Sequence, residues 1–408
     1  MRILILGGDG YLGWPTALHF SAAGHEVAVA DNMGKRYWEA ELGVEPLRPI
    51  RPLQTRVARW RELTGKTIRV YVGDIAENHR FVYRMFEEFQ PEAVVHYAEQ
   101  PSAPYSMYDR ERSVFTQRNN VLGTMNVIFA MRHACPDAHL VKLGTMGEYG
   151  TPNIDIEEGW LQVEHNGRRD RVLYPKRPGS FYHLSKVHDS ANLEFSCRIW
   201  GTRVTDLNQG VVYGFDTDET CLHPDLTTSI HYDAVFGTVL NRFIVQAAMG
   251  LPLTVYGEGG QTRGYINIRD TVRCVELAVM HPAAPGEFRV LNQFTQQFSV
   301  TELAELVARV AESRGRGVEI AHLDNPRVEA EAHYYNAKHS ELERLGLVPN
   351  LLSDEVVGHM LELAEKSREN VNPSLIEPAV RWKQPLWHPV TPAGDRDSSS
   401  APPASQDR

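Results

Sequence analysis

Short apolar runs and segments of helical period alternate along the first half of the chain. The apolar runs predict strands near residues 2–6, 26–30, 67–72, 92–97, 138–143 and 204–207. The helical periods predict helices near residues 13–24, 79–89, 111–133 and from Tyr182 to the residue before Gly201. Beyond them, residues 216–233 are polar and irregular and predict a loop or lid, and residues 234–249 predict a further helix.

A glycine-rich turn follows the first predicted strand. Gly7, Gly10 and Gly13 lie between that strand and a helix, and Asp31 ends the second strand. This order is typical of a dinucleotide site, where the backbone approaches the pyrophosphate at the helix N-terminus and the acid binds the adenosine ribose. Asp31 favours NAD over NADP, although Arg36 could accept a 2′-phosphate. A plain tight turn is the alternative interpretation.

A tyrosine and a lysine lie one helical turn apart at Tyr182 and Lys186, on one helix face. A phenol with its ordinary pKa of about 10 is a poor base at neutral pH. A nearby ammonium lowers that pKa, so the pair could take a proton from a sugar hydroxyl while hydride leaves the same carbon. Thr145, at the end of the predicted strand 138–143, would hydrogen-bond the same alcohol. A chance Tyr-x-x-x-Lys on a surface helix is the alternative.

Other polar residues are placed where a ligand could reach them. The loop 98–106 follows a predicted strand, and ligands bind at such ends of α/β sheets. Asp74 could bind the adenine amine or cap the next helix. Arg242, Arg263 and Arg327 are candidates to clamp a diphosphate, because guanidinium matches phosphate geometry. For each arginine, a packing or surface role is an equal alternative.

The bulk composition argues against several classes of protein and site. The 408 residues carry a net charge of −10, which argues against a nucleic-acid-binding surface. The four scattered cysteines indicate neither a zinc site nor a disulfide framework, and no metal site is expected. No apolar run is long enough to span a membrane and no signal segment precedes residue 2, so we expect a cytoplasmic protein. Residues 386–408 are rich in Pro, Ser and Ala and predict a disordered tail.

The combination of motifs resembles a known family. The glycine turn, Asp31, Thr145 and Tyr182-x-x-x-Lys186 together resemble the extended short-chain dehydrogenase/reductase family of nucleotide-sugar epimerases and dehydratases. Within it, longer strings look like the UDP-sulfoquinovose synthase family, and the resemblance runs from residue 1 to about 385. These strings lie at residues 8–11, 102–107, 140–157, 181–190, 206–214, 232–242, 260–270 and 325–338.

The resemblance implies a fold and a reaction. It implies a Rossmann-type doubly wound parallel sheet in residues 1–207, which binds NAD tightly, and an interleaved, smaller mixed α/β part in residues 208–385 for the UDP-sugar. It implies that UDP-glucose and sulfite become UDP-sulfoquinovose through a 4-keto-5,6-ene, with NAD recycled, for sulfolipid head groups. It further implies a homodimer or higher oligomer. Free sulfite and a sulfite-donating protein both remain open.

The resemblance leaves the acid and base of the elimination open. The related 4,6-dehydratases have Asp and Glu directly after the Thr, where this chain has Met146 and Gly147. We expect His183 and Glu148 to share the proton transfers at C5 and O6; the alternative for His183 is packing beside the cofactor. Met146 could pack against C6 or belong to the core. Pro101 stands where chloroplast members have Arg, which leaves the sulfite contact open.

The predicted contacts follow from these assignments. Those to the cofactor are Gly7, Gly10, Tyr11, Leu12, Gly13, Asp31, Asn32, Arg36, Asp74, Ile75, Ala98, Asn119, Tyr182, Lys186 and Val212. Those to the substrate are Gln100, Ser102, Tyr105, Thr145, Asn208, Gln209, Thr238, Arg242, Tyr256, Gln261, Arg263, Arg327 and Glu329. The alternatives are a nucleotide-sugar 4-epimerase or 4,6-dehydratase, and a non-catalytic NAD-binding sensor.

Overall fold

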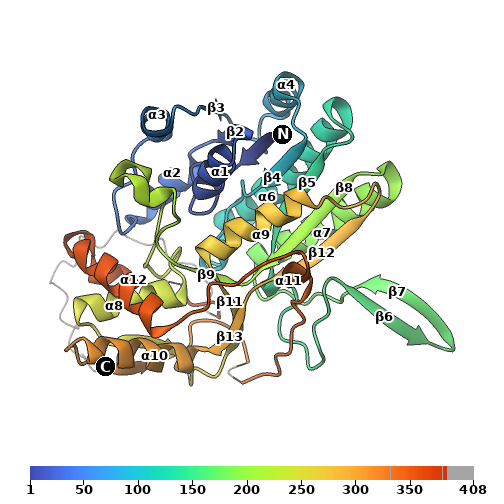
Figure 1. Cartoon of the computed structure of the whole chain (residues 1–408). Coiled ribbons are helices and arrows are strands. Elements are labelled where there is room, and N and C mark those ends of the chain that lie inside the picture. Colours follow the sequence, from blue (N-terminus) through green and yellow to red (C-terminus); the bar gives the residue numbers. More distant parts are fainter. Residues whose placement is uncertain (331, 379, 384–408) are drawn as a thin grey trace, which may run out of the picture.

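A seven-stranded parallel sheet forms the centre of the molecule in the computed structural model, which describes residues 1–330, 332–378 and 380–383 (Figure 1). Its strand order is β12-β8-β5-β4-β1-β2-β3, and every neighbouring pair is parallel. The strands are β1 (Arg2–Leu6), β2 (Glu26–Asp31), β3 (Ile68–Val72), β4 (Ala93–His96), β5 (His139–Thr145), β8 (Arg203–Gln209) and β12 (Phe288–Gln293). The predicted doubly wound α/β fold is confirmed.

Helices cover both faces of this sheet because successive strand side chains point to opposite sides. Ile3 and Ile5 of β1 pack in one core with α1 and α9, whereas Leu4 and Leu6 pack in another with α4, α6 and α7. The helices are α1 (Gly13–Ala22), α4 (His79–Phe89), α6 (Arg110–Ala134), α7 (Phe181–Trp200) and α9 (Ile268–Met280).

A smaller part lies at the carboxyl ends of the strands and has a core of its own (Figure 1). Its helices are α8 (Val239–Met249), α10 (Val300–Ser313) and α12 (Asp354–Lys366). Its strands are β9 (Val211–Tyr213), β10 (Leu253–Tyr256), β11 (Thr262–Asn267), β13 (Gln296–Ser299) and β14 (Ile320–Leu323). Between β11 and β13 the chain returns to the large sheet through α9 and β12, so the two parts are interleaved along the sequence.

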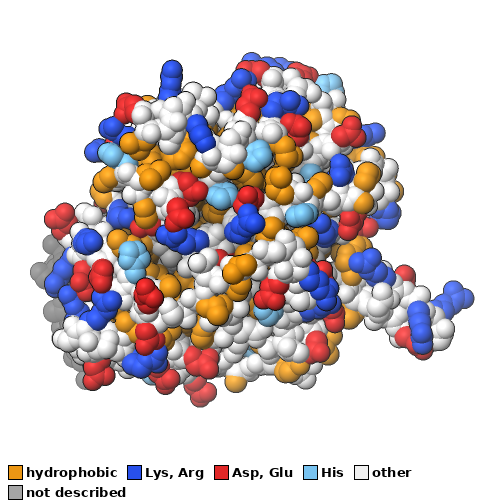
Figure 2. Space-filling model, in the orientation of Figure 1, with side chains coloured by type: hydrophobic (Ala, Val, Ile, Leu, Met, Phe, Trp, Pro, Cys, Tyr) orange, Lys and Arg blue, Asp and Glu red, His pale blue; other side chains and the backbone are white. Residues whose placement is uncertain are grey.

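The remaining elements are short or peripheral. They are α2 (Gly34–Leu42), α3 (Leu53–Thr64), α5 (Ala103–Ser106), α11 (Glu341–Arg344), the hairpin of β6 (Trp160–His165) and β7 (Arg168–Leu173), and 3-10 turns at Met146–Glu148, Thr220–Leu222, Pro224–Leu226, Arg368–Asn370 and Pro373–Leu375. The hairpin was not predicted; it projects from the body and carries basic side chains (Figure 2).

Two expectations need correction or fall outside the structure. The helix expected at residues 234–249 begins only at Val239, because the carboxylate of Asp233 accepts hydrogen bonds from the amides of Val235 and Phe236 (2.8 Å each) and holds a turn there. The tail predicted at residues 386–408 lies outside the described residues. Among the described helices, none has the length and apolar character needed to cross a bilayer.

The irregular segment 214–238, which we call the strap, runs from β9 past α1 and α3 to α8 (Figure 1). The Trp14 indole donates to the Leu226 carbonyl (2.9 Å), and the Thr228 hydroxyl donates to the Tyr11 carbonyl (2.7 Å). The His19 ring binds Glu219 of the strap and Glu276 of α9 at 2.9 Å each. Burial alone would lower the pKa of His19, but these two carboxylates raise it to about 9, so the link is ionic at neutral pH.

Candidate active site

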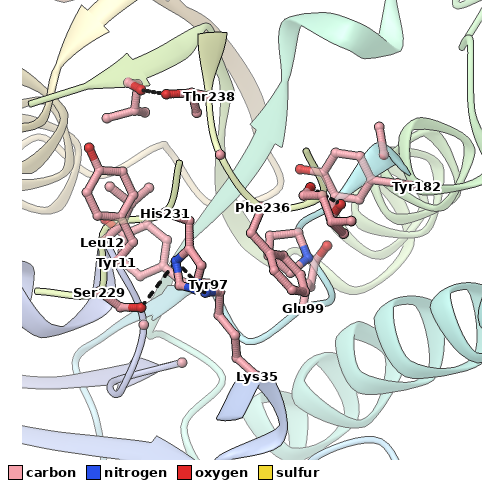
Figure 3. A pocket seen from close by; sticks show the side chains of 18 of the residues that line it. Tyr11, Leu12, Lys35, Tyr97, Glu99, Tyr182, Ser229, His231, Phe236 and Thr238 are labelled. Carbon is pink, nitrogen blue, oxygen red and sulfur yellow. Dashed lines mark hydrogen bonds between the residues drawn. The ribbon is translucent and has the colours of Figure 1, made fainter. Parts of the chain in front are cut away.

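A cavity of about 730 Å³ lies between the large sheet and the smaller part. It brings together most of the predicted site residues, although they come from segments far apart in the sequence (Figure 3). Those that line it are Gly7, Gly10, Tyr11, Leu12, Gly13, Asp31, Asn32, Arg36, Ile75, Ala98, Ser102, Asn119, Thr145, Tyr182, His183, Gln209, Val212, Thr238, Arg242, Tyr256, Gln261, Arg263, Arg327 and Glu329.

The glycine turn closes tightly against its own backbone. The amides of Gly7 and Gly8 both donate to the Ala30 carbonyl, at 2.8 and 3.3 Å. A Cβ on Gly13 would lie 2.0 Å from the Gly7 carbonyl oxygen, and Gly7 has a φ of 87°. Only glycine fits these two positions, and the turn delivers the first amides of α1 to the cavity. The local geometry therefore fits a dinucleotide pyrophosphate.

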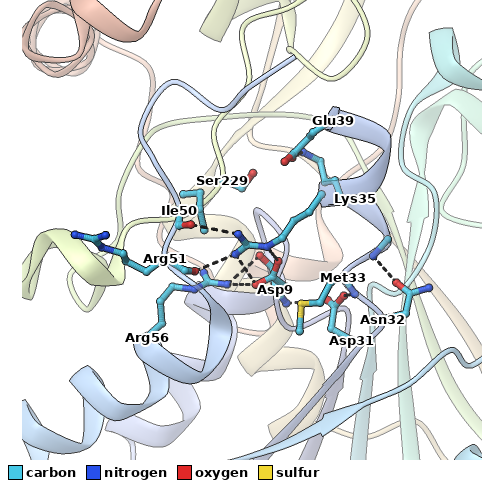
Figure 4. A network of polar contacts seen from close by, with 12 residues as sticks. Asp9, Asp31, Asn32, Met33, Lys35, Glu39, Ile50, Arg51, Arg56 and Ser229 are labelled. Carbon is cyan, nitrogen blue, oxygen red and sulfur yellow. Dashed lines mark hydrogen bonds and ion pairs between the residues drawn. The ribbon is translucent and has the colours of Figure 1, made fainter. Parts of the chain in front are cut away.

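Asp31 is held in place by a buried charge network (Figure 4). Its carboxylate accepts hydrogen bonds from the amides of Asp9 (2.8 Å) and Met33 (2.7 Å). The carboxylate of Asp9 in turn binds Arg56 and, at 2.6 Å, Arg36. Burial raises the pKa of Asp31 to about 6, which leaves it ionised at neutral pH. Because Arg36 is engaged by Asp9, the arrangement favours a free ribose over a 2′-phosphate.

Thr145 and Tyr182 both line the cavity. Thr145 ends β5, and Tyr182 lies in the first turn of α7, whose N-cap is Ser180. The ammonium of Lys186 lies 5.7 Å from the centre of the Tyr182 ring. The expectation that this pair lowers the pKa of the phenol is wrong for the protein alone: burial raises the pKa of Tyr182, and the carboxylate of Glu99 adds to that rise.

Glu99 was not among the predicted site residues, yet it lines the cavity and binds Lys186 at 2.6 Å. Its other oxygen lies 2.7 Å from the Lys142 ammonium, which is also 3.3 Å from Asp189. Burial alone would raise the pKa of Glu99, but the two ammonium groups outweigh it and lower that pKa to about 2. The polarity of the loop 98–106 indicated a site, but no local pattern showed the pairing with Lys186.

His183 is half-buried at the cavity wall, and its imidazole is neutral. Its Nδ1 lies 3.0 Å from the Ser180 hydroxyl. Burial, with a smaller contribution from Arg327 and Arg263, lowers the pKa of His183 to about 3. The ring also packs against Gly147, where a Cβ would lie 2.4 Å from its Nε2.

Other predicted residues, all within the described part of the chain, lie behind the cavity lining: Asp74, Gln100, Tyr105, Met146, Glu148, Lys186 and Asn208. Glu148 is fully buried, where it pairs with Lys176 and accepts from the Ser190 hydroxyl (3.0 Å). Met146 belongs to a small core with Tyr149 and Tyr174. These surroundings favour the core role for Met146 and do not place Glu148 beside a substrate.

The remaining residues behind the lining support their neighbours. Asp74 accepts from the amides of Ala76 (2.8 Å) and Glu77 (2.9 Å) and holds a turn before α4, whose N-cap is Asn78, so the capping alternative for Asp74 is wrong. The side-chain amide of Asn208 donates through Nδ2 to the Tyr149 hydroxyl at 2.7 Å. Gln100 binds Ser102 within its own loop, and Tyr105 stacks on Phe236 at 6.2 Å between ring centres.

The end of the cavity formed by the smaller part is rich in guanidinium groups. Arg242 donates to the Tyr256 hydroxyl (3.1 Å) and lies over that ring at 4.4 Å. Arg263 pairs with Glu329 at 2.6 Å. Within the described residues, the buried Arg242 Nε and Gln261 Oε1 have no hydrogen-bond partner. Such buried polar atoms are satisfied by a polar ligand, and a diphosphate with its nucleoside fits them.

A cluster around Lys35 that also lines the cavity was not predicted from the sequence. Lys35 lies 2.8 Å from Glu39 and 2.9 Å from the His231 ring, and its ammonium lies over the Phe236 ring (Figure 3). His231 and Phe236 belong to the strap, so the cluster joins the strap to α2 beside the cavity. Nothing in the spacing of these residues linked segments so far apart in the sequence.

Comparison with known proteins identifies relatives across most of the chain. Residues 3–292 match the model of the NAD dependent epimerase/dehydratase family. The chain is 57% identical over 383 residues to the chloroplastic UDP-sulfoquinovose synthase of Spinacia oleracea, covering 94% of this chain and 79% of that protein. It is 43% identical over 390 residues to the UDP-sulfoquinovose synthase of Sulfolobus acidocaldarius, covering 95% and 99%.

Solved structures share the fold at low sequence identity. The UDP-glucose 4-epimerase of Thermotoga maritima with UDP-glucose has a TM-score of 0.67 at 20% identity, and covers 90% of this chain and 99% of its own. The UDP-glucose 4-epimerase of Bifidobacterium longum in complex with NAD+ and UDP has a TM-score of 0.67 at 19% identity, with 91% and 100% covered. Both therefore share the fold of this chain.

The glycine turn yields a test of cofactor retention. In Gly13→Ala the new Cβ meets the Gly7 carbonyl oxygen at 2.0 Å, so the turn must open and we expect at least a ~10-fold loss of bound dinucleotide. The measurement is the molar ratio of NAD to purified protein after gel filtration. Gly179→Ala is the matched control, because its Cβ meets nothing within 4 Å. Full NAD content in the Gly13 variant would contradict this account of the turn.

Proposed function

This chain belongs to the NAD-dependent epimerase/dehydratase family, and we propose that it acts as a UDP-sulfoquinovose synthase that joins UDP-glucose and sulfite. The observation that carries the proposal is identity of 57% and 43% to two proteins of that name, over almost the whole chain. The cavity supports it, because the residues of the proposed chemistry line one wall and the guanidinium groups line the other end.

NAD is the cofactor of this family, and when bound it accepts and later returns one hydride at C4 of the sugar. Tyr182 removes the proton of the 4-hydroxyl, and Thr145 orients that hydroxyl at the end of β5. Lys186 acts from behind Tyr182: its ammonium supports negative charge on the phenol oxygen. The C4 carbon then carries a carbonyl, which acidifies the proton on C5.

His183 is our proposed base for the C5 proton, because it is a titratable side chain that lines the cavity beside Tyr182. Loss of that proton and departure of the 6-hydroxyl as water leave a double bond between C5 and C6. Sulfite adds to C6 through sulfur, C5 regains a proton, and return of the hydride and the hydroxyl proton at C4 completes the product. Glu148, paired with Lys176 behind the wall, would support the site without contacting the sugar.

The finer assignments belong to the same proposal. Residues 1–207 form the NAD-binding part and 208–385 the UDP-sugar part, with residues 268–293 returning to the large sheet. Pro101 and Ser102 line the cavity, and we place sulfite at this loop. Free sulfite and a sulfite-donating protein are both compatible with it. We propose a cytoplasmic location, although the spinach relative is chloroplastic.

We also propose a homodimer built on α6 and α7. These two helices pack on each other and expose large apolar side chains, whose burial against a second copy would remove them from water. They are Val114, Leu122 and Phe129 of α6, and Phe181, Phe195 and Ile199 of α7. The interface would be isologous, as in most two-fold dimers.

Product analysis tests the proposed function directly. Mass spectrometry of the reaction with UDP-glucose should show one hydroxyl replaced by a sulfonate only when sulfite is present. A product of unchanged mass that co-elutes with UDP-galactose would instead identify a 4-epimerase, and loss of water without sulfonate would identify a dehydratase. Bound NAD that UDP-glucose never reduces would contradict any catalytic role.

A deuterium label tests the role of His183. With UDP-glucose deuterated at C5, His183→Ala should lose the label at least ~100-fold more slowly than the wild type, because proton transfer by a positioned side chain contributes that much. Reduction of bound NAD should stay within a few-fold. Met146→Leu, a change in the small core, is the control and should retain both rates. Label loss at the wild-type rate in His183→Ala would leave this residue a packing role.

The oligomer proposal has a simple test. Ile199 is 52% exposed on α7, and Ile199→Glu would place a charge in the proposed interface. We expect light scattering to report a dimer for the wild type and a monomer for this variant at micromolar concentration. Val348→Glu, at a site that is 82% exposed outside α6 and α7, should stay dimeric. A wild-type monomer would overturn the proposal.

A further inference from the structure

Two buried lysines share one carboxylate and one carbonyl behind the catalytic wall. Glu99 binds Lys186 at 2.6 Å through Oε2 and Lys142 at 2.7 Å through Oε1. The Leu143 carbonyl accepts from both ammonium groups, at 2.6 Å from Lys186 and 3.1 Å from Lys142. The same two acceptors thus hold both ammonium groups. Removal of one lysine would therefore change the charge and the hydrogen bonding around the other.

Lys142 has no contact with the cavity, yet it is 1% exposed and charged. Burial alone would lower its pKa, but the carboxylate of Glu99 outweighs that effect and raises it. A buried ammonium carries a large desolvation cost, and an apolar side chain of similar length would fill the same space without it. Packing alone therefore does not explain a lysine at position 142, whereas its ion pair with Glu99, which also binds Lys186, indicates an electrostatic role.

We propose that Lys142 is a positioning residue for the oxidation at C4: it divides the charge of Glu99, so that Lys186 keeps a net positive charge beside Tyr182. With Glu99 and Lys186 alone, the carboxylate would cancel the ammonium and oppose a phenolate. With both lysines, the group of three carries one net positive charge. This inference rests on the proposed role of Tyr182 as proton acceptor.

The neighbouring charges leave this balance in place. His96 of β4 faces Glu99, and burial lowers its pKa to about 3, so it is neutral. Asp189 of α7 faces Lys142, and burial raises its pKa to about 8, so it is mostly protonated at pH 7. Asp206 of β8 accepts from the Ser190 hydroxyl at 2.7 Å. Glu148 pairs with Lys176, which completes the set of charged groups around the cluster.

The anchoring of the loop makes Glu99 a rigid mediator. The amide of Gln100, its neighbour, donates to Asn120 Oδ1 at 2.8 Å, and Asn120 Nδ2 donates to the Ser185 hydroxyl at 2.9 Å. These bonds join the loop after β4 to α6 and to α7 beside Lys186. The backbone next to Glu99 is therefore held in place, and the carboxylate shared by the two lysines links a change at Lys142 to Lys186.

The test is the pH dependence of NAD reduction in a single turnover with UDP-glucose. In Lys142→Met the phenol should lose its proton less readily, so the acid limb should move up by about one pH unit. That shift corresponds to a rate ~10-fold lower on the limb, since one pKa unit is a factor of ten. The plateau at high pH should approach the wild-type rate. NAD content and unfolding temperature are measured on the same samples.

A second variant separates charge from structure. Glu99→Gln/Lys142→Met removes one charge of each sign and restores the single positive charge, so the acid limb should return toward its wild-type position. Where Lys142→Met folds poorly, Lys142→Met/Asp189→Asn removes the carboxyl left behind and should show the same upward shift. An unshifted limb, or a loss equal at every pH, would overturn the inference. A wild type in which UDP-glucose never reduces NAD would instead refute the proposed function.

Discussion

The burial of ammonium groups behind the reacting residues is the constraint that orders this molecule. A lysine that acts on a phenol must stay dry and charged, and a dry charge must be answered by a carboxylate at close range. Glu99, which follows β4, supplies that carboxylate for two ammonium groups, those of Lys142 in β5 and Lys186 in α7. These ion pairs join the segment after β4 to β5 and to α7. The strands β4 and β5 are neighbours in the large sheet, so their carboxyl ends lie close together.

The two-part architecture serves the same centre. The large sheet presents the glycine turn, Asp31 and Thr145 at the carboxyl ends of its strands, while the smaller part supplies Arg242 and Arg263. Because α9 and β12 return from the smaller part to the sheet edge, the chain crosses between the parts more than once. The two parts are therefore joined by several chain connections.

Local patterns predicted the features whose physics is local. The glycine turn, Asp31 and the Tyr182–Lys186 spacing depend on short stretches of chain, and the structure places the turn, Asp31 and Tyr182 at one cavity with Lys186 behind its wall. Features that depend on distant partners were not predictable. Glu148 turns to Lys176 behind the wall, and Glu99 pairs with lysines 43 and 87 positions away in the sequence, because tertiary packing selects those partners. The pKa of Tyr182 was predicted in the wrong direction, since burial cannot be judged from spacing alone.

The contacts of the strap restrict how one side of the cavity can open. It crosses the dinucleotide end of the cavity and is tied to α1 through Trp14, Tyr11 and His19. Because these contacts come from several residues along the strap, they must open together before the strap can move away from the cavity. Opening of this side of the cavity is thereby coupled to the local stability of the strap and α1.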